Sequence, residues 1–267
     1  MIEAIFKYEF MQNAVTISLI ASLMCAIAGV ISVERRSVML SGGIAHTAYG
    51  GVGLGYLLGF EPLLGAAIFS VGAAFLIGFI SRRGKKGTDV ATALLWSLGM
   101  ALGIAFISFM DSYPPDINSY LFGNILSVTK SDIYLALPLS VLMLLVLMVF
   151  YRDWQSFLFD PEFSEVSGLR TRVFENVLLV MTALTVVVLI KATGIILVIA
   201  LLAAPASCAA FFTKTLRGRI FAAFLFGIFF SFSGIALSYA FSIPSGAAIV
   251  FTAVAAYFIL LLTMGKK

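Results

Sequence analysis

The sequence has few charged residues and only one histidine, His46. Charged side chains make up 11% of the 267 residues, and hydrophobic ones make up 61%. An ordinary soluble domain is about a quarter charged. A soluble fold with this composition would expose far too much apolar surface to water, so the composition indicates a membrane protein.

Cysteine is also scarce. Cys25 and Cys208 both lie inside apolar runs, and neither has another Cys or a His nearby at the spacing of metal ligands. We therefore expect two small buried side chains rather than a disulfide or a metal site. The N-terminus carries Glu3, Lys7 and Glu9 before the first apolar run, without a basic start or a small-residue cleavage site, so no cleavable signal is expected.

Motifs of several enzyme classes are missing. The RRGKKGTD stretch is not a nucleotide-binding loop, because Phe79 stands where the first glycine is needed and Lys86 replaces the Ser or Thr. A single histidine excludes HExxH-type metalloproteases, and no buried base pairs with a Ser or Thr of the apolar runs. We therefore expect no enzymatic activity. Lys191, Asp89 and Glu175 lie at the ends of runs, so the mid-span ionisable groups of proton- or sodium-coupled pumps are missing too.

Nine apolar runs alternate with polar joints. In lipid, helices satisfy the backbone hydrogen bonds within one segment. The sequence therefore predicts an all-α polytopic membrane protein with about eight to nine transmembrane helices, forming a single transmembrane domain over residues 1–267. The runs are 13–33, 40–59, 62–80, 90–110, 132–150, 173–190, 194–212, 220–240 and 246–263.

Basic residues are concentrated in alternate joints. If the C-terminus is cytoplasmic, 14 of the 17 basic residues lie inside and only Lys7, Lys130 and Lys191 lie outside, as the positive-inside rule expects. Six acidic residues then lie outside, giving that face a net charge of −3. This charge either favours the approach of a cation or is simply tolerated there. The inside basic residues are Arg35, Arg36, Arg82, Arg83, Lys85, Lys86, Arg152, Arg170, Arg172, Lys214, Arg217, Arg219, Lys266 and Lys267.

The second run, LSGGIAHTAYGGVGLGYLLG, has two different faces when drawn as a helix. Gly51, Gly55 and Gly59 form a stripe of small residues that would let another helix pack closely. A neutral imidazole on the other face suits zinc, copper, iron or nickel, and glycines would leave room around it. Two interpretations stay open: His46 contacts a metal ion, or it only holds the bundle together. The residues of this second face are Gly42, His46, Tyr49, Gly50 and Gly53.

This run and the later TGIILVIALLAAPASCAAFF resemble the metal-ion class of ABC transporter permeases, the membrane subunits of zinc and manganese importers. The stretches KKGTDVATALLWSLGMALGIAFIS, YLFGNILSVTKSDIYLALPL and FDPEFSEVSGLRTRVFENVLLV agree with the same family. The last third, through IPSGAAIVFTAVAAYFILLL, is also similar to cobalamin and siderophore importer permeases, which share the broader fold. The resemblance covers nearly the whole chain.

The resemblance implies a set of partners in the cell membrane. It implies a permease homodimer with one pathway along its axis, two cytoplasmic ATP-binding cassette subunits that hydrolyse ATP, and an extracytoplasmic metal-binding protein. Zn²⁺ or Mn²⁺ would pass transiently, with no tightly bound cofactor. The family commonly has an aspartate four residues before the histidine, where this chain has Gly42, so one expected ligand is absent. Tyr49, Gly42, Gly50 and Gly53 would line the pathway beside His46.

The resemblance also implies a cytoplasmic loop that contacts the ATPase. The first candidate is the segment from Ala204 to Arg219, although its basic residues could equally be positive-inside anchors. The second candidate is the loop from Asp160 to Gly168. The residues expected to act in the first segment are Pro205, Lys214, Arg217 and Arg219.

These expectations lead to a main hypothesis and two alternatives. The main one is import of a divalent transition metal by alternating access, with zinc favoured over manganese because an imidazole without a carboxylate suits the softer ion. The first alternative is a permease for a metal chelate or cofactor. The second is a membrane scaffold without transport activity, or an intramembrane enzyme.

Overall fold

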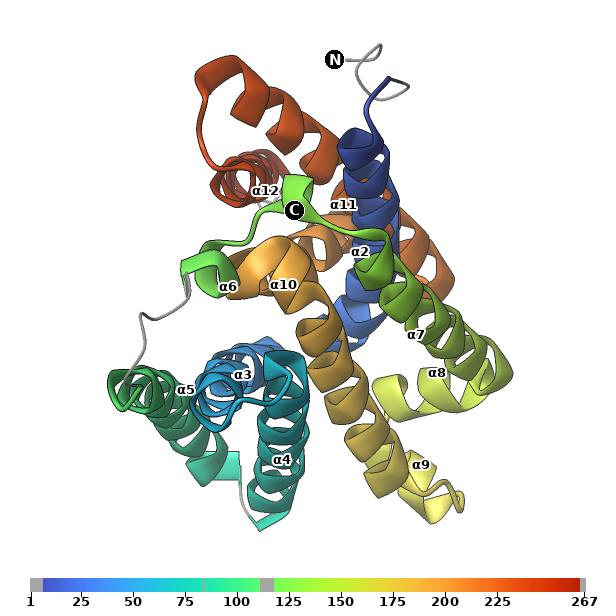
Figure 1. The fold of residues 1–267 in the computed structure, drawn as a ribbon. Coiled ribbons are helices and arrows are strands. Elements are labelled where there is room, and N and C mark those ends of the chain that lie inside the picture. Colours follow the sequence, from blue (N-terminus) through green and yellow to red (C-terminus); the bar gives the residue numbers. More distant parts are fainter. Residues whose placement is uncertain (1–6, 84, 111–117, 265–267) are drawn as a thin grey trace. The chain divides into compact units, whose positions relative to one another are not determined.

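The computed structural model describes residues 7–83, 85–110 and 118–264 (Figure 1). Helices are the only regular secondary structure in these ranges, which confirms the predicted all-α class. The elements are α2 (Glu9–Glu34), α3 (Val38–Leu58), α4 (Pro62–Arg83), α5 (Lys85–Ser108), α6 (Asn118–Phe122), the 3₁₀ turn η1 (Ile125–Ser127), α7 (Lys130–Val149), α8 (Tyr151–Phe159), α9 (Pro161–Val166), α10 (Thr171–Phe212), α11 (Leu216–Phe241) and α12 (Ser245–Met264).

Seven of the described helices are long and apolar enough to cross a membrane: α2, α4, α5, α7, α10, α11 and α12. Two features explain why this number is below the nine predicted runs. The predicted runs 173–190 and 194–212 both lie in the 42-residue α10, which has a non-helical residue at Gly194. The run 40–59 forms α3, a 21-residue helix that is rich in glycine and carries His46, Thr47 and Tyr49.

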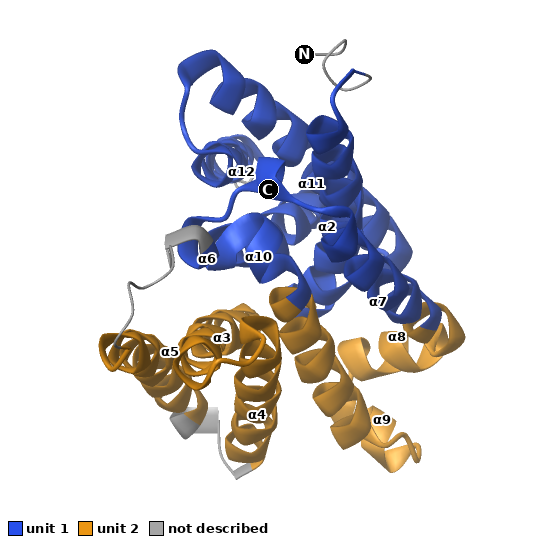
Figure 2. Ribbon diagram, viewed as in Figure 1, with its two compact units in different colours: residues 1–33, 118–145, 188–267 blue, residues 34–117, 146–187 orange. Residues whose placement is uncertain are grey.

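The chain forms two compact units (Figure 2). Unit 1 contains residues 1–33, 118–145 and 188–267, and unit 2 contains residues 34–117 and 146–187. The chain passes from one unit to the other four times, and α10 contributes to both. The single transmembrane domain predicted from the sequence stays a prediction.

In unit 1, the backbone at the end of α6 lies against the break in α10. Gly194 has φ 74° and ψ 160°, a conformation that is essentially restricted to glycine. A Cβ at Gly194 would overlap the backbone of Phe122 and Gly123, and a Cβ at Gly246 would overlap the carbonyl of Phe122. The break therefore lies beside the start of α12. The helical parts before and after Gly194 match the two runs that the sequence predicted separately.

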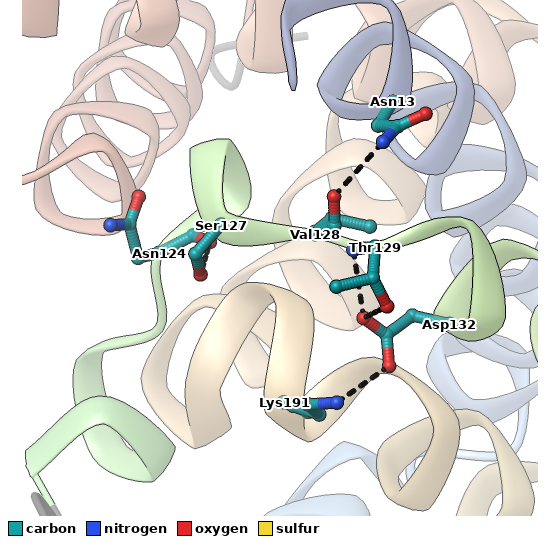
Figure 3. A network of polar contacts seen from close by, with 7 residues as sticks. All are labelled: Asn13, Asn124, Ser127, Val128, Thr129, Asp132 and Lys191. Carbon is teal, nitrogen blue, oxygen red and sulfur yellow. Dashed lines mark hydrogen bonds and ion pairs between the residues drawn. The ribbon is translucent and has the colours of Figure 1, made fainter. Parts of the chain in front are cut away.

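A network of polar contacts holds the segment before α7 (Figure 3). The Asp132 carboxylate accepts hydrogen bonds from the Thr129 amide and hydroxyl, at 2.9 and 2.7 Å. Thr129 is the residue before α7 and Asp132 is the third residue of the helix. A side chain at the third position that accepts from the backbone amide of the capping residue forms half of a capping box. The other Asp132 oxygen lies 3.0 Å from Lys191 Nζ, and Asn13 Nδ2 donates to the Val128 carbonyl at 3.2 Å. These contacts join α2, α7 and α10.

In unit 2, α3 packs against α4 and α5, and part of its surface reaches the first half of α10. The apolar core at this last contact consists of Ile44, Ala74, Ile77, Leu179 and Ala183. The short α8 buries Trp154 and Phe157 and leaves its polar side chains outside. Both buried rings meet Phe174 of α10, with ring centroids 4.9 and 6.0 Å away. The region after α7 is therefore held by aromatic packing.

The break in α10 leads to the first prediction. Gly194→Ala should destabilise the protein by about 2 kcal/mol, because a side chain is strained at this φ and ψ and meets the backbone of Gly123. The measurement is the thermal unfolding midpoint of the purified protein in detergent. Gly72→Ala is the matched control, because a Cβ there meets nothing within 4 Å. Equal midpoints for the two variants would contradict this account of the break.

Candidate functional site

The helix α3 positions His46 and is buried over most of its length. Every residue from Ser41 to Gly53 is buried, so α3 has no exposed side over this stretch, and before it only Met39, in the first turn, carries an exposed side chain. The helix ends at Gly59, whose φ of 72° forms a left-handed C-cap, and Phe60 N donates to the Gly55 carbonyl at 3.0 Å. A helix with neighbours on several sides needs small residues, which explains its many glycines.

The imidazole of His46 lies between α3 and α5, and only 9% of the residue is exposed. Its ring stacks on the Trp96 indole with 4.1 Å between centroids and 15° between planes. Its Nδ1 lies 3.3 Å from the Met100 sulfur. A thioether has no hydrogen to donate, so Nδ1 carries the hydrogen when this contact is a hydrogen bond. Nε2 then keeps its lone pair, which is the form of the imidazole that can bind a metal ion.

The Trp96 ring also occupies the space opposite Gly42. A Cβ at Gly42 would lie 3.0 Å from the edge of this indole. A carboxylate side chain at position 42 would therefore have to displace the ring. Trp96 thus takes up the space that an aspartate at position 42 would need. The side chain in contact with the His46 imidazole is the Met100 thioether, which is a softer group than a carboxylate.

The other residues predicted to line a pathway face α5 closely. A Cβ at Gly50 would lie 2.9 Å from the Gly99 carbonyl, and one at Gly53 would lie 2.7 Å from the Gly103 carbonyl. The Tyr49 ring covers Gly103, and Tyr49 is only 5% exposed. The space expected around His46 is therefore filled by α5 in this structure. That these residues also line a pathway stays a prediction.

The second glycine stripe faces α4. A Cβ at Gly51 would overlap the backbone of Gly65, and one at Gly55 would lie 2.6 Å from the Pro62 Cα. The sequence predicts a close helix contact at both of these positions. Gly59 differs from the prediction, because a Cβ there would meet nothing within 4 Å. Its role is to end α3 in the left-handed conformation, which favours glycine for a different physical reason.

The segment from 204 to 219 is not the loop that the sequence predicted. Pro205 is buried inside α10, which continues to Phe212. Proline is tolerated inside membrane helices because neighbouring groups can compensate for its missing hydrogen bond. It therefore does not mark the start of a loop here. The connection between α10 and α11 is short, and α11 starts after Thr215, whose hydroxyl accepts from the Gly218 amide at 3.2 Å.

The basic residues of this segment lie at the connection and in the first turn of α11. Lys214 and Arg217 are exposed. Arg219 is partly buried, and its Nε donates to the Thr213 carbonyl at 2.9 Å. Arg219 thus stabilises the end of α10. A contact of these residues with an ATPase stays a prediction.

The second predicted loop, 160–168, contains the short helix α9. Asp160 caps it by accepting from the Phe163 amide at 3.0 Å, and Pro161 is its first residue. The sequence carried this signal, since aspartate followed by proline is typical of a helix start. Phe159, Phe163 and Val166 are 93, 68 and 88% exposed, so α9 and its start present large apolar side chains.

Histidine, cysteine and carboxylate side chains do not gather into a metal site within the described residues. Groups of three or more that could hold an ion are absent there. Cys25 and Cys208 are both buried, and both are free thiols.

Comparison with known proteins identifies the family. The sequence model of the ABC 3 transport family matches residues 7–264. The chain belongs to this family. The resemblance to metal-ion ABC transporter permeases is thus confirmed, and so is the expectation of a multi-pass membrane protein.

Two relatives match over nearly their full length. An uncharacterized membrane protein of Synechocystis sp. is 40% identical, over 97% of this chain and 93% of that protein. The manganese transport system membrane protein MntC of Listeria innocua is 32% identical, over 100% of this chain and 95% of that protein.

Two solved structures have the same fold. PsaBC from Streptococcus pneumoniae, in complex with Fab, is 28% identical with a TM-score of 0.87, over 97% of this chain and 94% of that one. A transporter described as of the metal-chelate type, in an inward-facing conformation, has a TM-score of 0.78 over 97% of this chain and 88% of that one. It is 15% identical, so it shows the fold alone.

The packing of α3 leads to the second prediction. Gly53→Ala should lower the thermal unfolding midpoint in detergent, because its Cβ would press on the backbone carbonyl of Gly103, which cannot move without separating α3 from α5. Gly42→Ala should have a smaller effect, because the Trp96 side chain can shift by a few tenths of an ångström. A larger drop in the unfolding midpoint for Gly42→Ala than for Gly53→Ala would contradict this account, because it would mean that the Trp96 side chain yields less than the α5 backbone.

Proposed function

We propose that this chain is the permease subunit of an ABC importer that moves manganese into the cytoplasm. The observation that carries the proposal is the similarity over almost the whole chain to MntC of Listeria innocua. The manganese import system permease protein ScaB of Streptococcus gordonii, 28% identical over 94% of this chain, supports the same cargo. Cargo, partners and mechanism are proposals that go beyond membership of the family.

Zinc is the second candidate cargo. The ligand that we propose, the imidazole of His46, suits zinc better than manganese, an ion that prefers carboxylate and carbonyl oxygens. Manganese remains the first candidate because two relatives are manganese transport proteins and because an importer's selectivity also depends on the protein that delivers its substrate.

The partners follow from what this chain lacks. Its sequence has no nucleotide-binding loop, so separate cytoplasmic ATP-binding subunits supply the energy. An extracytoplasmic metal-binding protein delivers the ion, and two copies of the permease form the pathway between them. ATP binding and hydrolysis switch the pathway between its outward-open and inward-open states. A chelate permease and a non-transporting scaffold are the competing functions, and the metal-chelate relative supports the first only at the level of fold.

In this mechanism, Nε2 of His46 is the transient ligand of the ion. The Met100 contact orients the ring and sets the hydrogen on Nδ1. The ion reaches Nε2 when α3 and α5 move relative to the packing seen here, because both α3 and the imidazole are buried. A single imidazole per subunit suits a brief contact, since tight sites use three or more ligands.

The α9 segment is the surface that contacts the ATP-binding subunit. The sequence places it on the cytoplasmic side, between Arg152 and the two arginines Arg170 and Arg172. The exposed Phe163 and Val166 of α9, together with Phe159 at the end of α8, offer the apolar anchors that a stable protein interface needs. The helix α8, which directly precedes α9, packs its aromatic side chains on Phe174 of α10. A displacement of α9 by the ATP-binding subunit would therefore also displace α10.

The experiment that tests the cargo measures metal uptake in cells with and without the gene, using radioactive manganese and zinc at equal concentrations. The expected result is a loss of manganese uptake that the restored gene corrects. Loss of zinc uptake alone would favour the second candidate. Unchanged uptake of manganese, zinc and iron would contradict a role in metal import.

The third prediction concerns His46. His46→Ala should reduce metal transport by at least about tenfold, because the only imidazole in the chain is lost, while dimer and ATPase assembly stay intact. Met100→Leu keeps the side-chain volume and removes the sulfur, so it should reduce transport less. Uptake assays and co-purification of the partner subunits measure the two effects. Normal transport by His46→Ala would leave His46 with a packing role only.

The fourth prediction concerns α9. Phe163→Ala should weaken binding of the ATP-binding subunit by about tenfold, because an exposed aromatic anchor is removed from the interface. Phe75→Ala, on the exposed face of α4, is the control and should bind normally. Co-purification and transport-coupled ATP hydrolysis are the measurements. Equal binding by both variants would exclude Phe163 from the contact.

A further inference from the structure

We propose that unit 2 contains a binding site for a phosphate ester, in a polar cavity beside Arg35 that the transport mechanism does not use. The cavity has a volume of about 430 Å³. Both basic and acidic side chains line it, together with hydroxyls and leucines. The lining residues that matter here are Arg35, Arg36, Ser37, Ser81, Asp89 and Glu175.

The guanidinium of Arg35 has hydrogen-bond donors for which the described residues provide no acceptor. Arg35 is partly buried and stacks over the Phe157 ring, with its guanidinium carbon 4.5 Å from the ring centroid. Burial lowers the pKa of Arg35 more than the Glu175 carboxylate raises it. Arginine nevertheless remains charged at any physiological pH. In the described part of the chain, no hydrogen-bond acceptor is bound to this guanidinium. Phosphate oxygens match its planar fork of donors with two parallel hydrogen bonds.

The Glu175 carboxylate, which interacts electrostatically with Arg35, is already engaged by other side chains. Glu175 accepts a hydrogen bond from the Ser81 hydroxyl at 3.3 Å and lies 3.7 Å from Arg82 Nη1. Its charge is therefore partly balanced by Arg82, which leaves Arg35 and Arg36 against Asp89 in the cavity. Ser37 immediately precedes α3, so the cavity also borders the positive end of the α3 dipole. Counting Arg82, which pairs with Glu175, three basic side chains stand against the two acidic ones that line the cavity, and this balance favours an anion.

The position of the cavity indicates where the phosphate comes from. Its charged residues lie in the joints that the positive-inside rule places at the cytoplasmic face, at the ends of apolar helices. Phospholipid phosphates occupy this level of a bilayer, and basic pockets between helices on this side bind lipid headgroups. Leu40, Leu178 and Leu179 form an apolar side of the same cavity. A lipid headgroup and a cytosolic phosphate ester share the required chemistry, and the experiment separates them.

The experiment measures thermal unfolding of the purified full chain in detergent with four added probes. These are dioleoylphosphatidylglycerol, inorganic phosphate, dioleoylglycerol (the same tails without phosphate) and oleate (an anionic tail without phosphate). Wild type should be stabilised by phosphatidylglycerol and much less by dioleoylglycerol or oleate. Arg35→Gln should raise the half-saturating concentration about tenfold, as expected for loss of a charge-assisted pair. Arg152→Gln is the control, because Arg152 is exposed on α8 and does not line the cavity.

Each outcome is decisive. Stabilisation by phosphatidylglycerol alone supports a lipid source, and stabilisation by inorganic phosphate as well supports a site that a soluble ester can fill. Equal stabilisation by oleate or dioleoylglycerol would overturn the proposal. So would unchanged half-saturation in both Arg35→Gln and Arg36→Gln. If Arg35→Gln does not fold, Arg36→Gln gives the answer by itself, because Arg36 is exposed and its side chain is not part of the packing.

Discussion

Contact between helix backbones without intervening side chains is the constraint on which unit 2 depends. Gly51 meets Gly65 of α4, while Gly53 meets Gly103 of α5 on another side of the same helix. In lipid, no hydrophobic driving force brings helices together, so close van der Waals packing at small residues must hold them. Because α3 is enclosed in this way, its polar residues His46 and Thr47 are shielded from lipid. Their partners come from α5 and from α3 itself: Met100 for His46, and the Gly43 carbonyl for Thr47.

The break at Gly194 solves a related problem in unit 1. A helix of 42 residues is about 63 Å long if it is straight, roughly twice the hydrocarbon thickness of a bilayer. Gly194 interrupts it beside Gly123 and Gly246, where three backbones approach without Cβ atoms between them. Polar contacts of Asp132 with Thr129 and Lys191 stabilise the neighbouring segment. Glycine and a few charged groups therefore replace the apolar contacts that would hold such a segment in a soluble protein.

The part of unit 2 that the positive-inside rule predicts to be cytoplasmic combines two kinds of surface. The exposed Phe163 and Val166 of α9 are apolar and suit a protein partner. The cavity beside Arg35 is polar and suits a small anion or a headgroup. Phe157 of the neighbouring α8 belongs to its buried aromatic group and also covers the Arg35 guanidinium. Transport and binding of a phosphate ester would thus depend on chemically different residues.

The sequence by itself determined the helical class, the positions of the apolar segments, the joint at Gly194 and the two glycine faces of α3, because lipid forces the backbone to satisfy its hydrogen bonds locally. Only the tertiary structure decided what those faces meet. Periodicity places Gly42 and His46 on one side of a helix, but it does not show that Trp96 and Met100, about fifty residues away, lie opposite. The continuation of α10 through Pro205 also depends on neighbouring helices, which no local pattern encodes. Gly59 is different, because its left-handed conformation ends α3 for a local reason.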